Sequence, residues 1–273
     1  MSATRVAFEK WEGLGNDFVL VEQDPATWSD ERVRAVCDRR RGVGADGVLF
    51  IDRGSPAELP RMIVRNADGS RPEMCGNGIR CVAAYLASHV KKAAGVMQIA
   101  SDAGPKRCDV SGGGGRYEVS VEMGPARIDG QLAVAIDGRV HVFTFADVGN
   151  PHAITFEPYE EAEIDRIGPR VATHPEGGTN VEFCRVVRGG DPADEPRVDV
   201  VVWERGVGRT LACGTGACAV ASAACAAGHF TSGAPVRVRL PGGDLSIAIA
   251  PGTWAATMRG PARRVFTGEV ETP

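Results

Sequence analysis

Two cysteines occupy matching positions in this 273-residue chain. Cys75 precedes the letters GNG and Cys213 precedes GTG, and each motif runs into an alanine-rich apolar segment. The Gly-x-Gly opening predicts a helix start, where unpaired N–H groups and the helix dipole favour a thiolate. A thiolate and a thiol on opposite faces of a carbon centre form the acid/base pair that inverts its configuration. The same N–H groups suit a substrate carboxylate and the negative charge that develops on deprotonation.

Other chemistries fit these motifs less well. No histidine pair completes the cysteine spacing into a structural zinc site. Residues 42–47 match G-x-G-x-x-G, but they follow a predicted helix and precede a strand, the reverse of the dinucleotide-binding order. None of the four lysines lies in a glycine-rich phosphate-binding context, which argues against pyridoxal phosphate. We therefore expect no metal and no cofactor. Ordinary burial in the core remains the alternative interpretation of Cys75 and Cys213.

A strand-rich fold must position the two motifs. Short β-branched or aromatic runs, separated by Gly, Pro, Asp or Asn, predict strands along most of the chain. Helices are predicted at residues 30–40, which are amphipathic, and at 76–90 and 214–229, which are apolar or small on every side. A helix without a polar face needs burial all round. We therefore predict an α+β protein with a sheet wrapped around a central helix in each half.

The chain also repeats itself. The letters CGNGIRCVAAY at residue 75 return as CGTGACAVASA at residue 213, and GPAR occurs at 124–127 and at 260–263. Asn16 and Asn150, and likewise Asn66 and Glu204, are related by similar offsets. Repeats in one order with a nearly constant offset predict a duplication. We expect an N-terminal half at 1–125, joined by the tail 261–273, and a C-terminal half at 126–260. A pseudo-two-fold axis would then place both thiols at one interdomain cleft, a preferred ligand site.

The composition carries no membrane or nucleic-acid signature. The net charge is −4, and no basic patch suggests binding to nucleic acid. No stretch approaches the ~18–20 apolar residues of a membrane span, and the first residues lack the apolar segment of a signal peptide. Eight cysteines without an export signal are typical of reduced thiols. We expect a cytoplasmic protein that binds a small molecule and neither nucleic acid nor membrane.

Six sequence blocks together resemble the diaminopimelate epimerase family. They are GLGNDF (13–18), RRGVGADGVL (40–49), NADGSRPEMCGNGIRC (66–81), GNPHA (149–153), TNVEF (179–183) and ERGVGRTLACGTGACA (204–219). The resemblance implies two β-barrel-like domains, each around a central helix, and a homodimer. It also implies interconversion of LL- and meso-diaminopimelate, without cofactor or metal, in bacterial lysine and peptidoglycan precursor synthesis.

The resemblance also assigns roles to individual residues. Cys75 and Cys213 correspond to the two acid/base residues, and His152 and Glu204 correspond to partners that poise the thiols. Arg205 is suited to grip the distal carboxylate in a forked pair. The remaining expected substrate contacts, together with Glu204, are Asn16, Asn66, Gly76, Asn77, Asn150, Asn180, Gly214 and Thr215.

Some positions depart from the family pattern. Gly47 stands where some members have glutamine, Arg209 adds a positive charge near the second motif, and the stretch before Asn180 is short. The rival interpretations are a related histidine, proline or hydroxyproline racemase and a redox-sensing binding protein with a switchable disulfide. Proline racemases usually carry histidine where this chain has Asn77, and they lack the Glu204-Arg205 pair.

Overall fold

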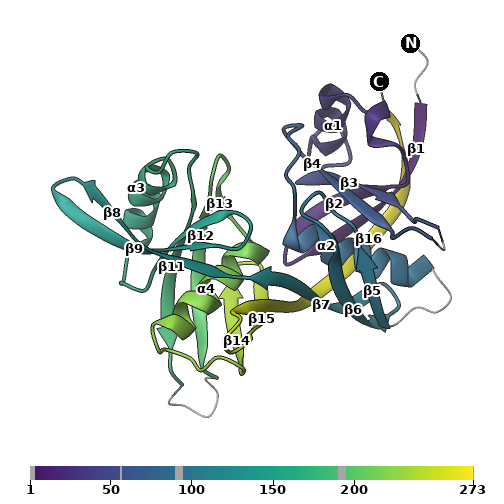
Figure 1. Cartoon of the computed structure of the whole chain (residues 1–273). Coiled ribbons are helices and arrows are strands. Elements are labelled where there is room, and N and C mark those ends of the chain that lie inside the picture. The colour runs from purple at the N-terminus through teal and green to yellow at the C-terminus, as the bar shows by residue number, and fades with distance from the viewer. Residues whose placement is uncertain (1–3, 56, 90–94, 190–194, 273) are drawn as a thin grey trace. The chain divides into compact units, whose positions relative to one another are not determined.

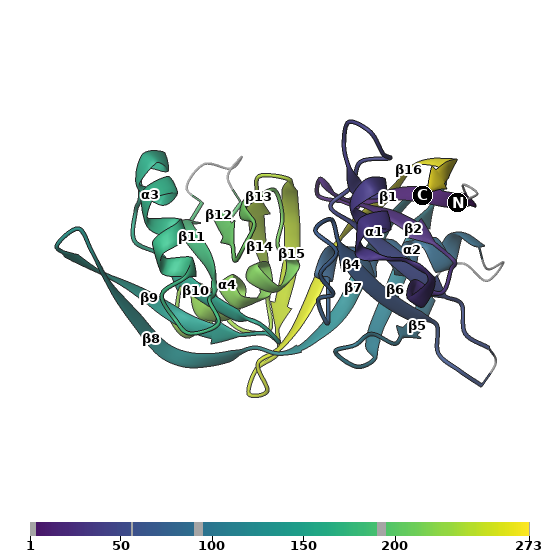
Figure 2. The same ribbon diagram turned by 90° about the horizontal axis from the view of Figure 1, so that it is seen from above.

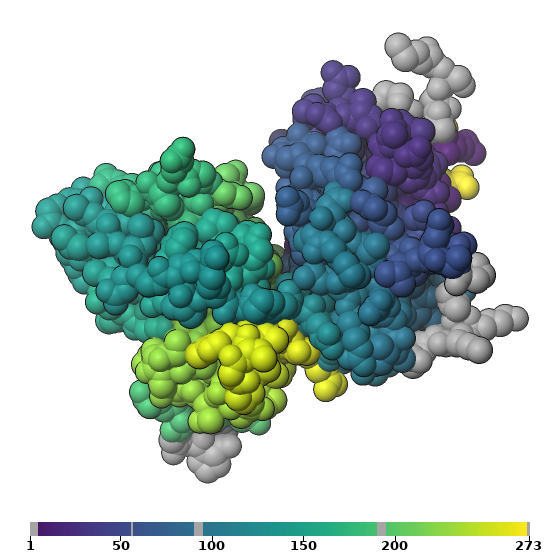
Figure 3. Space-filling model, in the orientation of Figure 1, coloured from purple at the N-terminus to yellow at the C-terminus, as the bar shows by residue number. Residues whose placement is uncertain are grey.

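The computed structural model describes residues 4–55, 57–89, 95–189 and 195–272, which form two units (Figure 1). The first unit comprises Met1–Val121 and Gly260–Pro273, and the second comprises Glu122–Arg259. The last strand, β16 (Ala255–Thr272), contributes to both units, and yellow atoms of the C-terminal segment are visible in each (Figure 3). Only the part of the C-terminal segment from Gly260 onward therefore belongs with the N-terminal unit.

The first unit is a sheet closed around helix α2 (Gly76–His89). The strand order is β4-β3-β2-β1-β16-β7-β6-β5. The edges meet where Met62 N donates to Ala100 O at 2.9 Å and Ala100 N donates to Pro60 O at 2.8 Å. This closure is the β-barrel-like form that the resemblance predicts. The strands are β1 (Thr4–Gly13), β2 (Asn16–Val21), β3 (Gly47–Asp52), β4 (Arg61–Asn66), β5 (Gly95–Ile99), β6 (Lys106–Gly113) and β7 (Arg116–Pro125).

The second unit surrounds helix α4 (Gly214–Ala226) in the same way. Its strand order is β16-β15-β14-β12-β11-β10-β9-β8, with the short β13 paired to β12. Ala126 N donates to Trp254 O at 2.9 Å, directly before β8 and β16 begin. The strands are β8 (Arg127–Ile136), β9 (Arg139–Asp147), β10 (Pro151–Thr155), β11 (Asn180–Val187), β12 (Arg197–Glu204), β13 (Gly208–Thr210), β14 (Pro235–Leu240) and β15 (Gly243–Ile249).

The two units share one topology. In the first, β2 and β3 pair in parallel with α1 (Asp30–Cys37) between them in sequence, β4 pairs antiparallel with β3, and α2 follows. In the second, β10 and β11 pair in parallel with α3 (Glu161–Ala172) between them, β12 pairs antiparallel with β11, and α4 follows. The predicted α+β class with two pseudo-symmetric halves is therefore confirmed.

The central helices lie where the sequence predicts them (Figures 1 and 2). Helix α2 is buried from Gly76 to Ala87, and α4 contacts six strands of its own unit. Val90, the last residue of the first predicted central helix, lies outside the described residues. Helix α4 ends at Ala226 rather than at 229, because Gly228 takes a φ of 73° and stops the helix. No helix in the described part of the chain has the length and apolar character needed to span a membrane.

Helix α3 was not predicted. It packs Ile164, Ile167 and Val171 against a cluster that includes Phe143 and Phe183. Its N-terminus is held where Glu160 N donates to the Glu163 carboxylate at 3.1 Å, which satisfies an otherwise unpaired amide. A short 3-10 helix, η1 (Pro25–Thr27), precedes α1 in the first unit. Each unit thus carries one helix inside its sheet, α2 or α4, and a shorter helix, α1 or α3, packed on a separate buried cluster.

Candidate active site

Both predicted thiols lie directly before a central helix. Helix α2 begins at Gly76, and Gly78 N donates to Cys75 Sγ at 3.3 Å. Cys75 is partly exposed. A Cβ at position 78 would lie 3.4 Å from Cys75 Sγ and 3.2 Å from Leu49 Cδ2. The glycine therefore lets the thiol approach the helix N–H groups closely.

A hydrogen-bonded chain in the first unit joins two of the predicted contact residues. Asn77, in the first turn of α2, donates to Asn16 Oδ1 at 3.0 Å, and Asn16 donates to Asp46 Oδ2 at 2.7 Å. The Asn77 side-chain oxygen accepts from the Arg80 guanidinium at 2.9 Å. Arg80 is fully buried and also donates to the Pro261 carbonyl at 3.2 Å. Asn16 and Asn77 are therefore oriented by Asp46 and Arg80, two residues outside the predicted set.

Asn66 belongs to a neighbouring turn. It ends β4, opposite Gly47 of β3, and its side-chain amide donates to Ser70 Oγ at 2.9 Å. Its backbone N donates to the Ser70 carbonyl at 2.9 Å, and Gly69 N donates to the Asn66 carbonyl at 2.8 Å. The hydrogen bonds of Asn66 hold it within this turn.

Cys213 lies in a more enclosed environment. Gly216 N donates to its Sγ at 3.4 Å, and Thr215 Oγ1 lies 3.5 Å from the same sulfur. Burial, followed by the negative charges of Glu204 and Glu182, raises the pKa of the Cys213 thiol well above its ordinary value, although the Thr215 and Gly216 contacts lower it. The expected preference for a thiolate at this helix start is therefore outweighed, because desolvation and two carboxylates oppose the N–H groups.

The predicted histidine is held between two side chains. His152 Nδ1 lies 2.7 Å from Glu182 Oε1, and its Nε2 lies 3.1 Å from Asn150 Oδ1. Both His152 and Glu182 are fully buried. Asn180 is the register partner of His152 in the parallel pair β10 and β11, and its amide donates to the Pro151 carbonyl at 3.4 Å. The unit therefore gathers Asn150, His152 and Asn180 at the start of these two strands.

Arg205 is anchored by the short stretch before Asn180. Its backbone N donates to Asn180 Oδ1 at 3.0 Å, and its guanidinium donates to the carbonyls of Gly177 and Gly178. Gly178 has a φ of 72°, and a Cβ there would lie 2.7 Å from Arg205 Cδ. The glycines thus let the short stretch turn tightly beneath the arginine. The guanidinium of Arg209 is directed toward α3, where it forms ion pairs with Glu161 and Asp165.

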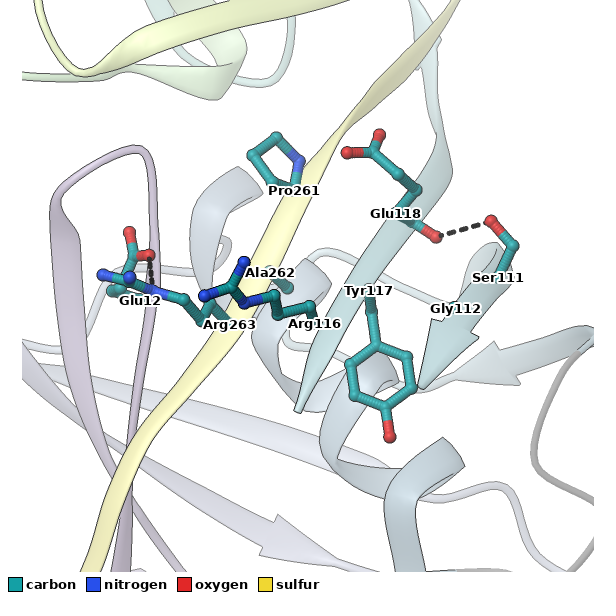
Figure 4. A pocket seen from close by; sticks show the side chains of 9 residues that line it. All are labelled: Glu12, Ser111, Gly112, Arg116, Tyr117, Glu118, Pro261, Ala262 and Arg263. Carbon is teal, nitrogen blue, oxygen red and sulfur yellow. Dashed lines mark hydrogen bonds and ion pairs between the residues drawn. The ribbon is translucent and has the colours of Figure 1, made fainter. Parts of the chain in front are cut away.

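A separate pocket of about 470 Å³ lies in the first unit (Figure 4). Arg263 Nε donates to Glu12 Oε1 at 2.9 Å along one side, and Ser111 Oγ donates to the Glu118 carbonyl at 3.4 Å on another. The other lining residues are Gly112, Arg116, Tyr117, Pro261 and Ala262. None of the predicted site residues lines this pocket. Within the described part of the chain, no three His, Cys, Asp or Glu side chains come together in a way that could hold a metal ion.

Comparison with known proteins identifies the family. The model of the diaminopimelate epimerase family matches residues 8–128 and 144–265, which together cover most of the chain. The chain belongs to the diaminopimelate epimerase family. A diaminopimelate epimerase from Rhizorhabdus wittichii is 40% identical over 286 residues, covering 98% of this chain and 96% of the relative. One from Desulforudis audaxviator is 40% identical over 282 residues, covering 96% and 98%.

Solved structures share the fold of this family member. A probable proline racemase from Agrobacterium radiobacter K84 superposes with a TM-score of 0.74 at 16% identity, covering 97% of this chain and 92% of that one. A hydroxyproline epimerase from Agrobacterium vitis gives 0.73 at 16% identity, covering 98% and 92%. At this identity the likeness shows the fold alone, and it supports two pseudo-symmetric units.

Sequence reasoning missed several residues that hold the predicted ones. They are Asp46, Arg80, Glu182 and Thr210, and each lies inside a block that marks the diaminopimelate epimerase family. Arg80 and Glu182 are ionisable residues within otherwise apolar segments that become fully buried. A buried ionisable residue requires specific partners. That requirement was the signal available in the sequence.

Thr210 positions the Glu204 carboxylate. Its Oγ1 donates to Glu204 Oε1 at 2.6 Å. We expect Thr210→Val, which keeps the shape and removes the hydroxyl, to lower kcat by roughly tenfold because Glu204 loses a hydrogen bond worth about 1.5–3 kcal/mol. Thr210→Ser should retain most of the rate. Steady-state kinetics with diaminopimelate checks this, and equal rates for the valine and serine variants would contradict it.

Proposed function

We propose that this protein interconverts LL- and meso-diaminopimelate, as a step of bacterial lysine and peptidoglycan precursor synthesis. The observation that carries the proposal is its similarity, at 40% identity over nearly the whole of both chains, to proteins named diaminopimelate epimerase. The family model supports the same reaction, since its two matched stretches include both thiol motifs.

The proposed mechanism uses Cys75 and Cys213 on opposite faces of the α-carbon. The thiolate of one cysteine removes the α-proton, and the electron pair left on carbon is delocalised into the carboxylate. The thiol of the other cysteine then donates its proton to the opposite face, so that the first cysteine ends as a thiol and the second as a thiolate. The two cysteines exchange roles in the reverse direction. After the product leaves, proton exchange with solvent restores the starting thiolate and thiol, so the cycle balances without a cofactor or a metal ion.

The environments of the two cysteines support this assignment. The eight cysteines are thiols rather than members of disulfides, so both Cys75 and Cys213 are available as acid or base. Because the pKa of Cys213 is raised, this cysteine keeps its proton at neutral pH and is suited to act first as the acid. Cys75 is more exposed and accepts a helix N–H bond, which favours a thiolate there. We therefore assign Cys75 as the base for one diastereomer and Cys213 as its acid.

The remaining predicted residues fit the substrate as charged partners. We propose that the N–H groups of Gly76, Asn77, Gly214 and Thr215 bind the carboxylate at the reacting carbon, because helix N-termini bind anions. The guanidinium of Arg205 binds the distal carboxylate, and Glu204 accepts from an ammonium group. The side-chain amides of Asn16, Asn66, Asn150 and Asn180 complete the polar contacts.

A coupled assay tests the proposed substrate. Reduced wild-type protein is incubated with LL-diaminopimelate, and formation of the meso isomer is followed by a meso-specific dehydrogenase. Parallel incubations contain L-histidine, L-proline and trans-4-hydroxy-L-proline, whose inversion is followed by chiral chromatography. We expect turnover of diaminopimelate alone. Inversion of any of the other three with a higher kcat/KM would reassign the enzyme to that substrate.

We also propose a homodimer that works in the cytoplasm. Cysteines that remain thiols fit a reducing compartment. The neighbouring Val265 and Phe266 of β16 are about half exposed, at 48% and 46%, although both are apolar. Such a pair of apolar residues on a strand is suited to an interface. Light scattering on the eluting protein should give twice the chain mass, and Phe266→Ser should shift it toward the monomer. A monomeric wild type would contradict the dimer.

A further inference from the structure

We propose that Glu182 is a positioning residue of the epimerase site, which holds His152 and Asn150 in place and sets a buried negative charge beside Cys213. This inference rests on the proposed function, and nothing in the sequence motifs assigned Glu182 a role. Glu182 lies on β11, between the apolar residues Val181 and Phe183. The strand is buried from Asn180 to Cys184, so the carboxylate of Glu182 lies in the interior of the unit.

Glu182, His152 and Asn150 form a chain of side-chain contacts. Glu182 Oε1 lies 2.7 Å from His152 Nδ1, and His152 Nε2 lies 3.1 Å from Asn150 Oδ1. The carboxylate is the acceptor for Nδ1–H, and this contact fixes the orientation of the ring. The ring in turn fixes the side chain of Asn150, one of the proposed substrate contacts. Glu182 is thus the buried end of a chain of three side chains.

Glu182 also lies close to the Cys213 thiol. A Cβ built on Gly216 would lie 2.6 Å from Glu182 Oε1 and 3.2 Å from Cys213 Sγ. Since both atoms lie close to this Cβ position, the carboxylate and the thiol lie within about 6 Å of one another. At that range a negative charge disfavours ionisation of the thiol. Glycine at position 216 is what leaves room for both.

The buried position of Glu182 carries a cost in folding free energy. Among the described residues, Glu182 Oε2 is buried and has no hydrogen-bond partner. A buried carboxylate oxygen without a donor destabilises the folded state. An apolar residue would avoid that cost at a position that is merely structural, whereas a glutamine would leave its own buried amide hydrogens without an acceptor. The carboxylate therefore serves the site rather than the stability of the fold, and its neighbour is the acid of the proposed reaction.

Few other charges compete for Cys213. Glu204 reaches it from β12, and His152 of β10 is bound to Glu182. On the other strands that contact α4, His141 of β9 lies 2.9 Å from Tyr159 Oη. The charged residues of β14 and β15 are Arg237, Arg239 and Asp244; both arginines pair with Asp244, and Arg237 also pairs with Glu195. Replacing Glu182 therefore removes one of two carboxylates that act on the thiol.

The pair Glu182→Gln and Glu182→Asp separates charge from geometry. Glutamine still accepts from His152 Nδ1 but carries no charge, and aspartate keeps the charge but is one methylene too short to reach the ring. We expect Glu182→Gln to shift the basic limb of the kcat/KM profile toward lower pH by about one unit or more, because Cys213 loses its proton more readily. We expect Glu182→Asp to leave that limb in place and to lower kcat by about 10²-fold, since His152 is no longer held.

A substrate-free measurement keeps the test independent of the proposed function. The rate of iodoacetamide alkylation at the Cys213 peptide is followed by mass spectrometry across a pH series for wild type, Glu182→Gln and the exposed control Glu157→Gln. We expect the midpoint for Glu182→Gln to fall by the same unit, and Glu157→Gln to match wild type. Identical midpoints for all three proteins would overturn the inference, whereas a shifted midpoint in a protein inactive on diaminopimelate would overturn only the proposed substrate.

Discussion

Replacing either Cys75 or Cys213 by alanine is expected to lower kcat for the conversion of LL- to meso-diaminopimelate by about 10²–10⁴-fold or more. A positioned acid or base contributes a factor of that size, and inversion needs one group on each face. The residual rate of each variant should be similar, because loss of the base and loss of the acid block the same overall reaction. Steady-state kinetics in both directions measures this.

Cys225 provides the matched control. It lies near the C-terminal end of the same helix, α4, that begins after Cys213, and it is partly exposed. Cys225→Ala should retain wild-type kcat within about twofold and should melt at nearly the same temperature. A wild-type rate in Cys75→Ala or Cys213→Ala, with the fold intact by circular dichroism, would remove that cysteine from the mechanism.

Replacing Arg80 by methionine is expected to cost about 3 kcal/mol of the free energy of unfolding, because a hydrogen bond from a charged donor contributes about 1.5–3 kcal/mol. Arg80 is fully buried, and its guanidinium donates to the Gly76 carbonyl at 3.2 Å, to Asn77 Oδ1 at 2.9 Å and to the Pro261 carbonyl at 3.2 Å. Methionine fills much of the volume but leaves these acceptors without their donor. Because Asn77 loses its fixed orientation, kcat/KM should fall as well.

Urea unfolding and hydrogen exchange of the α2 amides measure this effect. Hydrogen exchange reports on the first unit by itself, which matters because a protein of two units need not unfold in one step. The exposed Arg41→Met is the control, and it should change stability by less than about 0.5 kcal/mol. Wild-type protection of α2 in Arg80→Met would show that these hydrogen bonds are not needed.

The sequence predicts the fold class because the composition of the two central helices indicates that both are buried. Residues 76–90 and 214–229 have no polar face, so each must be surrounded, and a strand-rich chain supplies the sheet. Helix α3 was missed because Gly168 and Pro169 break an otherwise regular pattern of apolar residues. The duplication contained the missing information, since α3 is the counterpart of α1 between a parallel pair of strands.

The sequence predicts the motif residues of the candidate site, but it predicts far less well the residues that hold them in place. The glycines after Cys75 and Cys213 predict the starts of two helices, and both helices begin there in the structure. Arg80 and Glu182 are single ionisable residues within apolar segments, and only the folded structure shows which groups they meet. The raised pKa of Cys213 depends on burial and on two carboxylates from different strands, which a linear motif does not contain.

The central claim is that two thiols act on opposite faces of one carbon, and it is tested by running the reaction in D2O. Reduced wild-type protein converts LL-diaminopimelate, and mass spectrometry follows deuterium in substrate and product during the first few per cent of conversion. The base can return only the proton that it took from the substrate, so the remaining LL substrate should stay unlabelled. The acid carries deuterium from the solvent, so the product should contain one deuterium at the α-carbon. Deuterium that accumulates in the LL substrate ahead of product, or meso product that retains the original proton, would contradict the account.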